Sequence, residues 1–494
     1  MEKGTKTSGV FSKSRFVIAL SRWAGMFFSG LSFSSRRAKL VSMGLTGLML
    51  THAATVVAQT EIQAAKADRF VDSMGVNVHM EALSTPYKYY GAINAKLRSL
   101  GMRHVRDEIN DADLSFGKEI RRIGRLGYTV CGLIEGGNDY PGNGSKLEAD
   151  LVVPMIRSLL PVIDAVEGPN EPDDPTPLFA YDGACNPPQE IEACYPRGAI
   201  KESEDLWNIV KRNPEISDLP VVVMSEGSAP DFRRLARLTP PPIDYATFGN
   251  LHAYQGGDVG DSGLADSIRY SQSLTGRAPL WTTEMGYHNN TRYLSDGEQQ
   301  GVSERASAIY LPIAFLSAFS LGVLRTFSYE LIDEFDPHLF TDSGEGHYGL
   351  LHYDGTPKPA FIALKNLIAL LRQRESEDFE PGSLPVRVSG APRTMHYTLL
   401  QKSNGDYYLA LWNDVRVYKI AYQDGTKTVP GRDVYPPNVP VTLTFSSPYA
   451  FRIYAPADSS GINPTDRYTI STTAYSIKLD LPPEVLLVKI AGDR

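Results

Sequence analysis

Cysteine is scarce in this sequence, with three residues in 494. This excludes a dense disulfide framework of the kind that stabilises small secreted domains. Cys131 lies in the apolar segment YTVCGLI and is expected to be a buried thiol. Cys185 and Cys194 lie in one loop, which a disulfide between them would close in an oxidising compartment; two unpaired thiols are the alternative. No His or other Cys lies near that loop at ligand spacing, which argues against zinc.

Long runs of like charge are also absent. The net charge is −8, and a chain without a basic stretch is a poor candidate for binding nucleic acid. No Gly-rich phosphate turn follows the first strand candidate, in VNVHMEALSTPY, which argues against an open dinucleotide-binding sheet. Internal repeats and low-complexity tracts are missing as well. Beyond about residue 60, no run is long and apolar enough to span a bilayer.

The first 58 residues differ from the rest. A basic leader with a single acid, Glu2, precedes the almost uncharged stretch LVSMGLTGLMLTHAATVVAQ, which contains the small-residue pattern Val56-Val57-Ala58. This is typical of a signal peptide cleaved after Ala58, with an uncleaved membrane anchor as the alternative. Both predict that the remaining chain is exported, to the periplasm, the cell envelope or the medium.

From Met74 to Arg374, short apolar segments alternate with amphipathic ones. The expected strands are 74–79, 102–107, 128–134, 162–168, 220–226, 245–254, 279–285 and 322–331. The expected helices are 92–101, 116–127, 147–160, 202–212, 231–238, 265–274, 303–322 and 359–374. Strict alternation implies parallel strands joined by right-handed crossovers, and eight units in about 300 residues match a closed (β/α)₈ TIM barrel. We therefore predict an α/β barrel domain over residues 59–374.

The sequence changes character after Arg374. Residues 375–390 are expected to form a linker, and short alternating strands follow, separated by turns rich in Gly, Pro, Asn and Asp. The expected strands are 394–401, 406–414, 419–423, 440–446, 450–455, 475–480 and 485–491. This pattern predicts an all-β sandwich domain within residues 375–494.

Two carboxylates follow or end core strands of the predicted barrel. Glu171 lies in AVEGPNEPDD after the fourth strand, between Pro169 and Pro172, which restrict its backbone, and Glu284 ends the seventh strand in WTTEMGYH. Catalytic groups of such barrels lie at the C-terminal ends of the strands, so the two carboxyls are expected to face one cleft. Paired carboxylates of this kind perform glycoside hydrolysis. A lone NEP would be a solvated turn, so the specificity comes from the pair.

GPNEP after strand four and TTEMG at the end of strand seven resemble the signature of the clan A glycoside hydrolases, over roughly residues 74–374. The resemblance implies that Glu171 is the acid/base and Glu284 the nucleophile of a retaining mechanism. It also implies that Asn170 binds the sugar 2-hydroxyl and that no metal or organic cofactor is needed. A C-terminal β-sandwich recurs in several of these families.

Other positions matching the resemblance are Arg106 at the end of strand two, and His252 and Tyr254 on strand six. Surface pairing is the alternative for Arg106, and core packing for the other two. His79 and Tyr329 end strands one and eight and are expected to line a sugar subsite, Tyr329 by stacking, although many relatives have Trp there. A purely structural histidine is the alternative for His79. Trp281 is expected in the core.

The sequence thus predicts an exported hydrolase of O-glycosidic bonds acting on an oligo- or polysaccharide. Two alternatives remain open: an inert carbohydrate-binding or scaffold barrel, and a transglycosylase that uses the same carboxylates. No nucleic acid partner is expected, and a membrane contact only through an uncleaved N-terminal anchor.

Overall fold

The computed structural model describes residues 60–109, 114–136, 146–173, 181, 195–227, 235, 243–260, 262–276, 279–292, 299–339, 343–373, 378–424, 427–457 and 465–491. Every described residue belongs to one compact unit. The predicted leader 1–58, the Cys185–Cys194 pairing and, apart from Leu235, the helix expected at 231–238 lie outside the described residues.

Eight parallel strands form the first sheet, in the order β7-β6-β5-β4-β3-β10-β9-β8. They are β3 (Met74–Asn77), β4 (His104–Glu108), β5 (Thr129–Leu133), β6 (Ile163–Glu167), β7 (Val221–Val222), β8 (Gly249–His252), β9 (Leu280–Met285) and β10 (Arg325–Ser328). A parallel bridge between Val222 and Phe248 joins the two ends of this order and closes the barrel. Each strand falls within its predicted segment or overlaps it by all but one residue, so the predicted (β/α)₈ barrel is confirmed.

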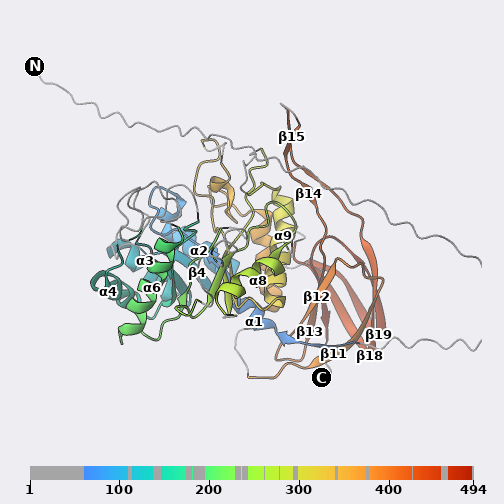
Figure 1. Ribbon diagram of the computed structural model, residues 1–494. Coiled ribbons are helices and arrows are strands. Elements are labelled where there is room, and N and C mark those ends of the chain that lie inside the picture. Colours follow the sequence, from blue (N-terminus) through green and yellow to red (C-terminus); the bar gives the residue numbers. More distant parts are fainter. Residues whose placement is uncertain are drawn as a thin grey trace, which may run out of the picture. The chain divides into compact units, whose positions relative to one another are not determined.

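Helices follow the strands, as Figure 1 shows for α2, α3, α4, α6 and α8. Their bounds are α1 (Ala67–Asp72), α2 (Tyr90–Leu100), α3 (Leu114–Arg125), α4 (Ala149–Leu159), α6 (Arg197–Arg212), α8 (Leu264–Leu274), α9 (Glu304–Ser320) and α10 (Pro359–Leu371), with 3₁₀ turns η1 (Pro86–Lys88) and η2 (Glu345–His347). Gly101, at φ 90°, ends α2 in the left-handed conformation. The Ser303 hydroxyl caps α9 by accepting from the Ala306 N–H. Among the described residues, no helix combines the length and hydropathy needed to cross a membrane.

The C-terminal part is a mixed sheet around one core, visible in Figure 1 at the labels β11, β12, β13, β18 and β19. Its strands are β1 (Thr60–Gln63), β2 (Ala65–Lys66), β11 (Ser383–Ser389), β12 (Met395–Gln401), β13 (Tyr407–Asn413), β18 (Val439–Ala455), β19 (Thr465–Leu481) and β20 (Leu486–Ile490). Small ladders join β14 (Tyr418–Lys419) to β17 (Arg432–Asp433) and β15 (Tyr422–Asp424) to β16 (Lys427–Val429). The first part of β18 pairs with β11 and its last part pairs with β20. One long strand therefore connects β11 to β20 within the sheet.

Two details differ from the sequence prediction. Strands β1 and β2, within the segment assigned to the barrel, pair with β11 and β12 of the C-terminal sheet. The expected linker 375–390 contains β11, because Leu384 and Val386 alternate with the more exposed Ser383, Pro385 and Arg387 and bury one face. Both ends of the barrel segment are therefore held by the C-terminal sheet.

Side chains of the barrel helices bond directly to the C-terminal part. Ser303 donates to Asp433 Oδ1 (2.5 Å), Tyr310 OH accepts from the Val417 N–H (2.8 Å) and Asn366 donates to the Pro456 carbonyl (3.1 Å). Trp412 of β13 is buried in the same apolar cluster as the barrel core. The two parts therefore share a packed interface.

The buried carboxyl of Glu202 on α6 makes stability depend on pH. Burial raises its pKa to about 8, with Glu135 and Asp205 adding to the rise, while the Gly136 N–H (2.7 Å) opposes it. The folded pKa of Glu202 exceeds the unfolded value of 4.5. The contribution of this residue to the free energy of unfolding is therefore fully present below pH 4.5 and is lost as the pH rises through 8. We expect wild type to lose about 3 kcal/mol more than Glu202→Gln between pH 5 and 8. Urea unfolding at both pH values measures this, and identical losses in the two proteins would contradict it.

Candidate active site

The site lies at the C-terminal ends of the barrel strands, and a bulge in β9 shapes it. Leu251 of β8 pairs with Thr282 whereas His252 pairs with Glu284, so Thr283 is an extra residue in β9. The ladder to β10 shifts at the same place. A bulge breaks the normal alternation of faces, so Thr283 and Glu284 both contribute to one polar network.

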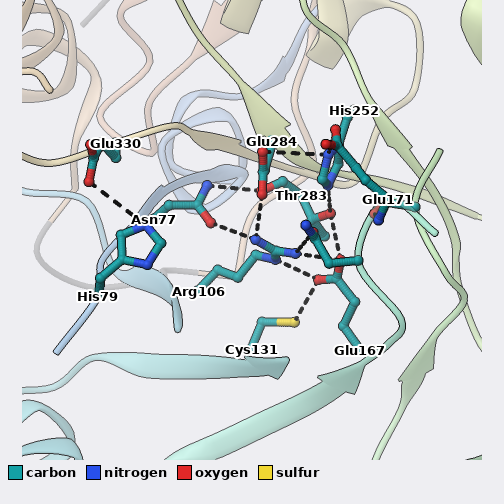
Figure 2. A network of polar contacts seen from close by, with 12 residues as sticks. Asn77, His79, Arg106, Cys131, Glu167, Glu171, His252, Thr283, Glu284 and Glu330 are labelled. Carbon is teal, nitrogen blue, oxygen red and sulfur yellow. Dashed lines mark hydrogen bonds and ion pairs between the residues drawn. The ribbon is translucent and has the colours of Figure 1, made fainter. Parts of the chain in front are cut away.

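Arg106 of β4 is the centre of this network (Figure 2). Its Nε and Nη2 donate to the two oxygens of Glu167, at 2.8 and 3.0 Å, and its Nη1 donates to Glu284 Oε1 at 2.8 Å. Nη1 also donates to Asn77 Oδ1 (3.1 Å) and Nη2 to Asn170 Oδ1 (2.7 Å). Arg106 is therefore buried and fully committed, not paired on the surface with a sequence neighbour.

Glu284 is held as a carboxylate. Its Oε2 accepts from Tyr254 OH at 2.6 Å, and His252 Nδ1 lies 3.4 Å away. Burial alone raises the pKa of Glu284, but the charges on His252 and Arg106 and the bond from Tyr254 outweigh it and hold the pKa below its usual range. Glu284 thus has the ionisation state that a nucleophile needs.

Glu171 follows β6 in an unusual backbone conformation. Its φ is 36°, in the left-handed region, which costs on the order of 1 kcal/mol for a residue other than glycine. Its N–H donates to Ser225 Oγ (3.1 Å), and its carboxyl lies against the backbone of Gly227, where a Cβ would come within 3.3 Å. Its Oε1 lies 2.6 Å from His252 Nδ1. The turn after β6 therefore directs this side chain toward β8 and β9.

The two carboxyls converge. One oxygen of Glu171, one of Glu284 and a ring nitrogen of His252 all lie within 4.8 Å of one another. Figure 2 shows both carboxyls beside the His252 ring. Carboxyl separations of about 5–5.5 Å accompany a retaining mechanism, whereas about 6.5–9.5 Å is needed for an inverting one.

Exposure falls from Glu171 inward. The exposed fraction of the side chain is 32% for Glu171, 8% for Glu284 and 0% for Glu167. Tyr254 and Asn170 are also partly exposed. Solvent, and so a ligand, reaches the pair from the side of Glu171.

His79 and Tyr329 lie at one edge of the site, in contact with each other at 5.6 Å between ring centroids. Tyr329 also contacts Tyr254, at 6.5 Å. His79 Nε2 faces Glu330 Oε2 at 3.8 Å, and that oxygen accepts from Tyr87 OH (2.9 Å). Burial, and secondarily the charge on Glu334, raises the pKa of Glu330 well above its usual range. This edge of the site is rich in carboxyls.

Two groups of described residues have donor atoms close enough to hold a metal ion. They are Glu171–His252–Glu284 and His79–Glu330–Glu334. In the first group, each of these carboxylate oxygens already has a hydrogen-bond partner. Glu171 Oε1 contacts His252 Nδ1, and the two oxygens of Glu284 accept from Arg106 and Tyr254. The first group is therefore complete as a hydrogen-bonded site of its own.

The structure brings together every predicted site residue: Glu171, Glu284, Asn170, Arg106, His252 and Tyr254 in one network, with His79 and Tyr329 at its edge. The bond from Arg106 Nη2 identifies the oxygen end of the Asn170 amide. Trp281 is buried as expected, with the Arg325 guanidinium over its ring.

Sequence reasoning missed the inner residues Glu167, Asn77, Asn250 and Thr283. A signal existed for Glu167, which is a carboxylate at the end of an apolar strand, as was argued for Glu171. Asn77 likewise interrupts the apolar run MGVNVH. Thr283 had no such signal, because its inward orientation depends on the bulge.

The chain matches no protein-family model and no curated protein sequence. Solved structures do resemble it. The GH39 enzyme from Xanthomonas axonopodis pv. citri has a TM-score of 0.53 at 14% identity, covering 87% of this chain and 96% of that one. A monomeric β-xylosidase from Caulobacter crescentus CB15 has 0.52 at 14%, covering 87% and 98%. A GH30 endoxylanase from Clostridium papyrosolvens C71 has 0.50 at 12%, covering 88% and 98%.

The chain shares the fold of these solved structures, a (β/α)₈ barrel with a β-rich C-terminal part. Because the likeness covers nearly the whole of each neighbour, it includes the C-terminal β-rich part as well as the barrel. The predicted fold class is confirmed. At identities of 12–14%, these neighbours support the same fold but not the same substrate.

Proposed function

We propose that this protein is a retaining glycoside hydrolase that cleaves O-glycosidic bonds of an oligo- or polysaccharide. The observation that carries the proposal is the convergence of Glu171 and Glu284 within 4.8 Å, with one of them ionised and the other partly exposed. This arrangement argues against a barrel that only binds carbohydrate. Binding alone does not require that Arg106 and Tyr254 hold one carboxylate beside a second carboxyl.

The two carboxyls have separate tasks in this proposal. In the first step Glu284 attacks the anomeric carbon while Glu171 gives its proton to the glycosidic oxygen, and the aglycone leaves. In the second step Glu171 takes a proton from water as that water attacks the anomeric carbon and releases Glu284. Asn170 donates to the 2-hydroxyl, and Tyr254 and Arg106 stabilise the charge that returns to Glu284.

The edge of the site at His79 contains both acidic and basic groups that a sugar could contact. Glu81, Glu330 and Glu334 surround His79, and the pKa values of His79, Glu330 and Glu334 are all raised. Export of the chain, expected from its leader, would bring the enzyme to polysaccharides outside the cell.

The stereochemistry of the product tests the mechanism. We expect the first product of an aryl glycoside, followed by ¹H NMR of its anomeric proton, to keep the configuration of the substrate. Product analysis over neutral and acidic glycans then identifies the substrate and shows whether water or a second sugar is the acceptor. Inversion, or binding without any turnover across the panel, would contradict the proposal.

A further inference from the structure

The hydroxyl of Thr283 lies between the inner nitrogen of His252 and two acceptors. Thr283 Oγ1 is 3.1 Å from His252 Nε2, 2.9 Å from Glu167 Oε1 and 2.9 Å from Asn250 Oδ1. Thr283 is completely buried, as are Glu167 and Asn250. No water can therefore replace any of these contacts without rearrangement.

Counting protons assigns the direction of each bond. A hydroxyl donates one hydrogen bond and accepts up to two. Asn250 donates its NH₂ to Glu167 Oε1 (2.9 Å) and to the Val223 carbonyl (3.2 Å), so its oxygen faces Thr283 as an acceptor. Glu167 is paired with Arg106 and also accepts. The Thr283 proton therefore goes to one of these two oxygens, and Thr283 Oγ1 can accept from His252 only if Nε2 carries a hydrogen.

The outer nitrogen of His252 is then left for Glu171. With a hydrogen on Nε2, the short 2.6 Å contact between Nδ1 and Glu171 Oε1 requires one more proton between them. That proton lies on Glu171 when the imidazole is neutral and on Nδ1 when it is charged. Losing it would leave two lone pairs facing each other, or force the remaining hydrogen from Nε2 to Nδ1 and break the bond to Thr283.

We propose that Thr283 is a positioning residue that sets the tautomer of His252 and so keeps the catalytic proton shared between His252 and Glu171. The catalytic meaning of this pair rests on the proposed function, but the tautomer does not. By opposing the state with one proton fewer, Thr283 extends the pH range in which Glu171 can act as an acid. The other charged or titratable groups around His252 are Glu284, Arg106 and Tyr254.

Thr283→Val and Thr283→Ser test the proposal. Valine matches the shape but removes the acceptor, so we expect the basic limb of the kcat/KM profile to move down by about one pH unit, the size of one net hydrogen bond. Serine keeps the hydroxyl and should keep the wild-type limb. A purely packing role would lower the rate of the valine variant without moving the limb, and that result would overturn the proposal.

Histidine-selective ¹⁵N labelling gives a readout independent of turnover. We expect Nε2 of wild-type His252, assigned with His252→Gln, to stay protonated from pH 5 to 8, and Thr283→Val to shift toward protonated Nδ1 with bare Nε2. A bare Nε2 in the wild type would overturn the inference even if the enzyme is active. A protonated Nε2 in a protein that hydrolyses no glycoside would instead refute the proposed function alone. Wild type and the serine variant suffice if the valine variant does not fold.

Discussion

Replacing Glu284 with glutamine is expected to lower kcat at least about a thousandfold, which corresponds to about 4 kcal/mol of barrier. The amide keeps the size of the side chain and its one oxygen can still accept from Arg106, but it cannot form the glycosyl ester. Initial rates on an aryl glycoside measure the loss, and circular dichroism verifies the fold.

Glu215→Gln is a matched control. Glu215 is an exposed carboxylate that pairs with Arg157 on the surface, so the same change of charge there should leave the rate unaltered. Glu284→Ala with added azide extends the test, because a small anion entering the vacated space should restore turnover and yield a glycosyl azide of inverted configuration. A glutamine variant as active as wild type would remove Glu284 from the mechanism.

Replacing Glu171 with glutamine is expected to have an effect that depends on the leaving group. Hydrolysis of an unactivated glycan should fall about a thousandfold, since general acid catalysis contributes roughly 10²–10⁴. The first step on a 2,4-dinitrophenyl glycoside should change little, because that phenolate leaves without a proton. Pre-steady-state release of dinitrophenol from both proteins measures it.

The difference between the two substrates is the diagnostic result for Glu171. An equal loss on both would mean that the variant disturbs the site generally, for example by removing the partner of His252 Nδ1. Glu171→Asp keeps the carboxylic acid but shortens the side chain. A loss on the glycan smaller than that of Glu171→Gln would measure the effect of side-chain length separately from the effect of losing the proton donor.

The proposed acid, Glu171, and the proposed nucleophile, Glu284, differ because of their neighbours. Glu284 lies between a guanidinium and a phenol in a buried position, so its carboxylate is stabilised. Glu171 lies on a solvent-facing turn and shares a histidine. Glu167 beneath them balances the charge of Arg106. Without it, Arg106 would hold Glu284 more strongly and make it a weaker nucleophile.

The order of elements could be read from the sequence. Alternating apolar strands and amphipathic helices have different periods, and these are local properties. The positions of Glu171 and Glu284 at the ends of the fourth and seventh strands followed from that order, because parallel strands bring their C-terminal ends to one face. For the same reason Arg106, His252 and Tyr254 could be assigned to the site before their contacts were known.

By itself, then, the sequence determined the barrel, the carboxylate pair and the elements that carry them. Only the tertiary structure decided that β1 and β2 join the C-terminal sheet, that Arg106 is shared between Glu167 and Glu284, and that a bulge turns Thr283 inward. These depend on pairing between segments far apart in the chain and on one-residue shifts of register. Neither leaves a mark on local hydrophobic periodicity, because the energy that selects them comes from partners that meet only when the barrel closes.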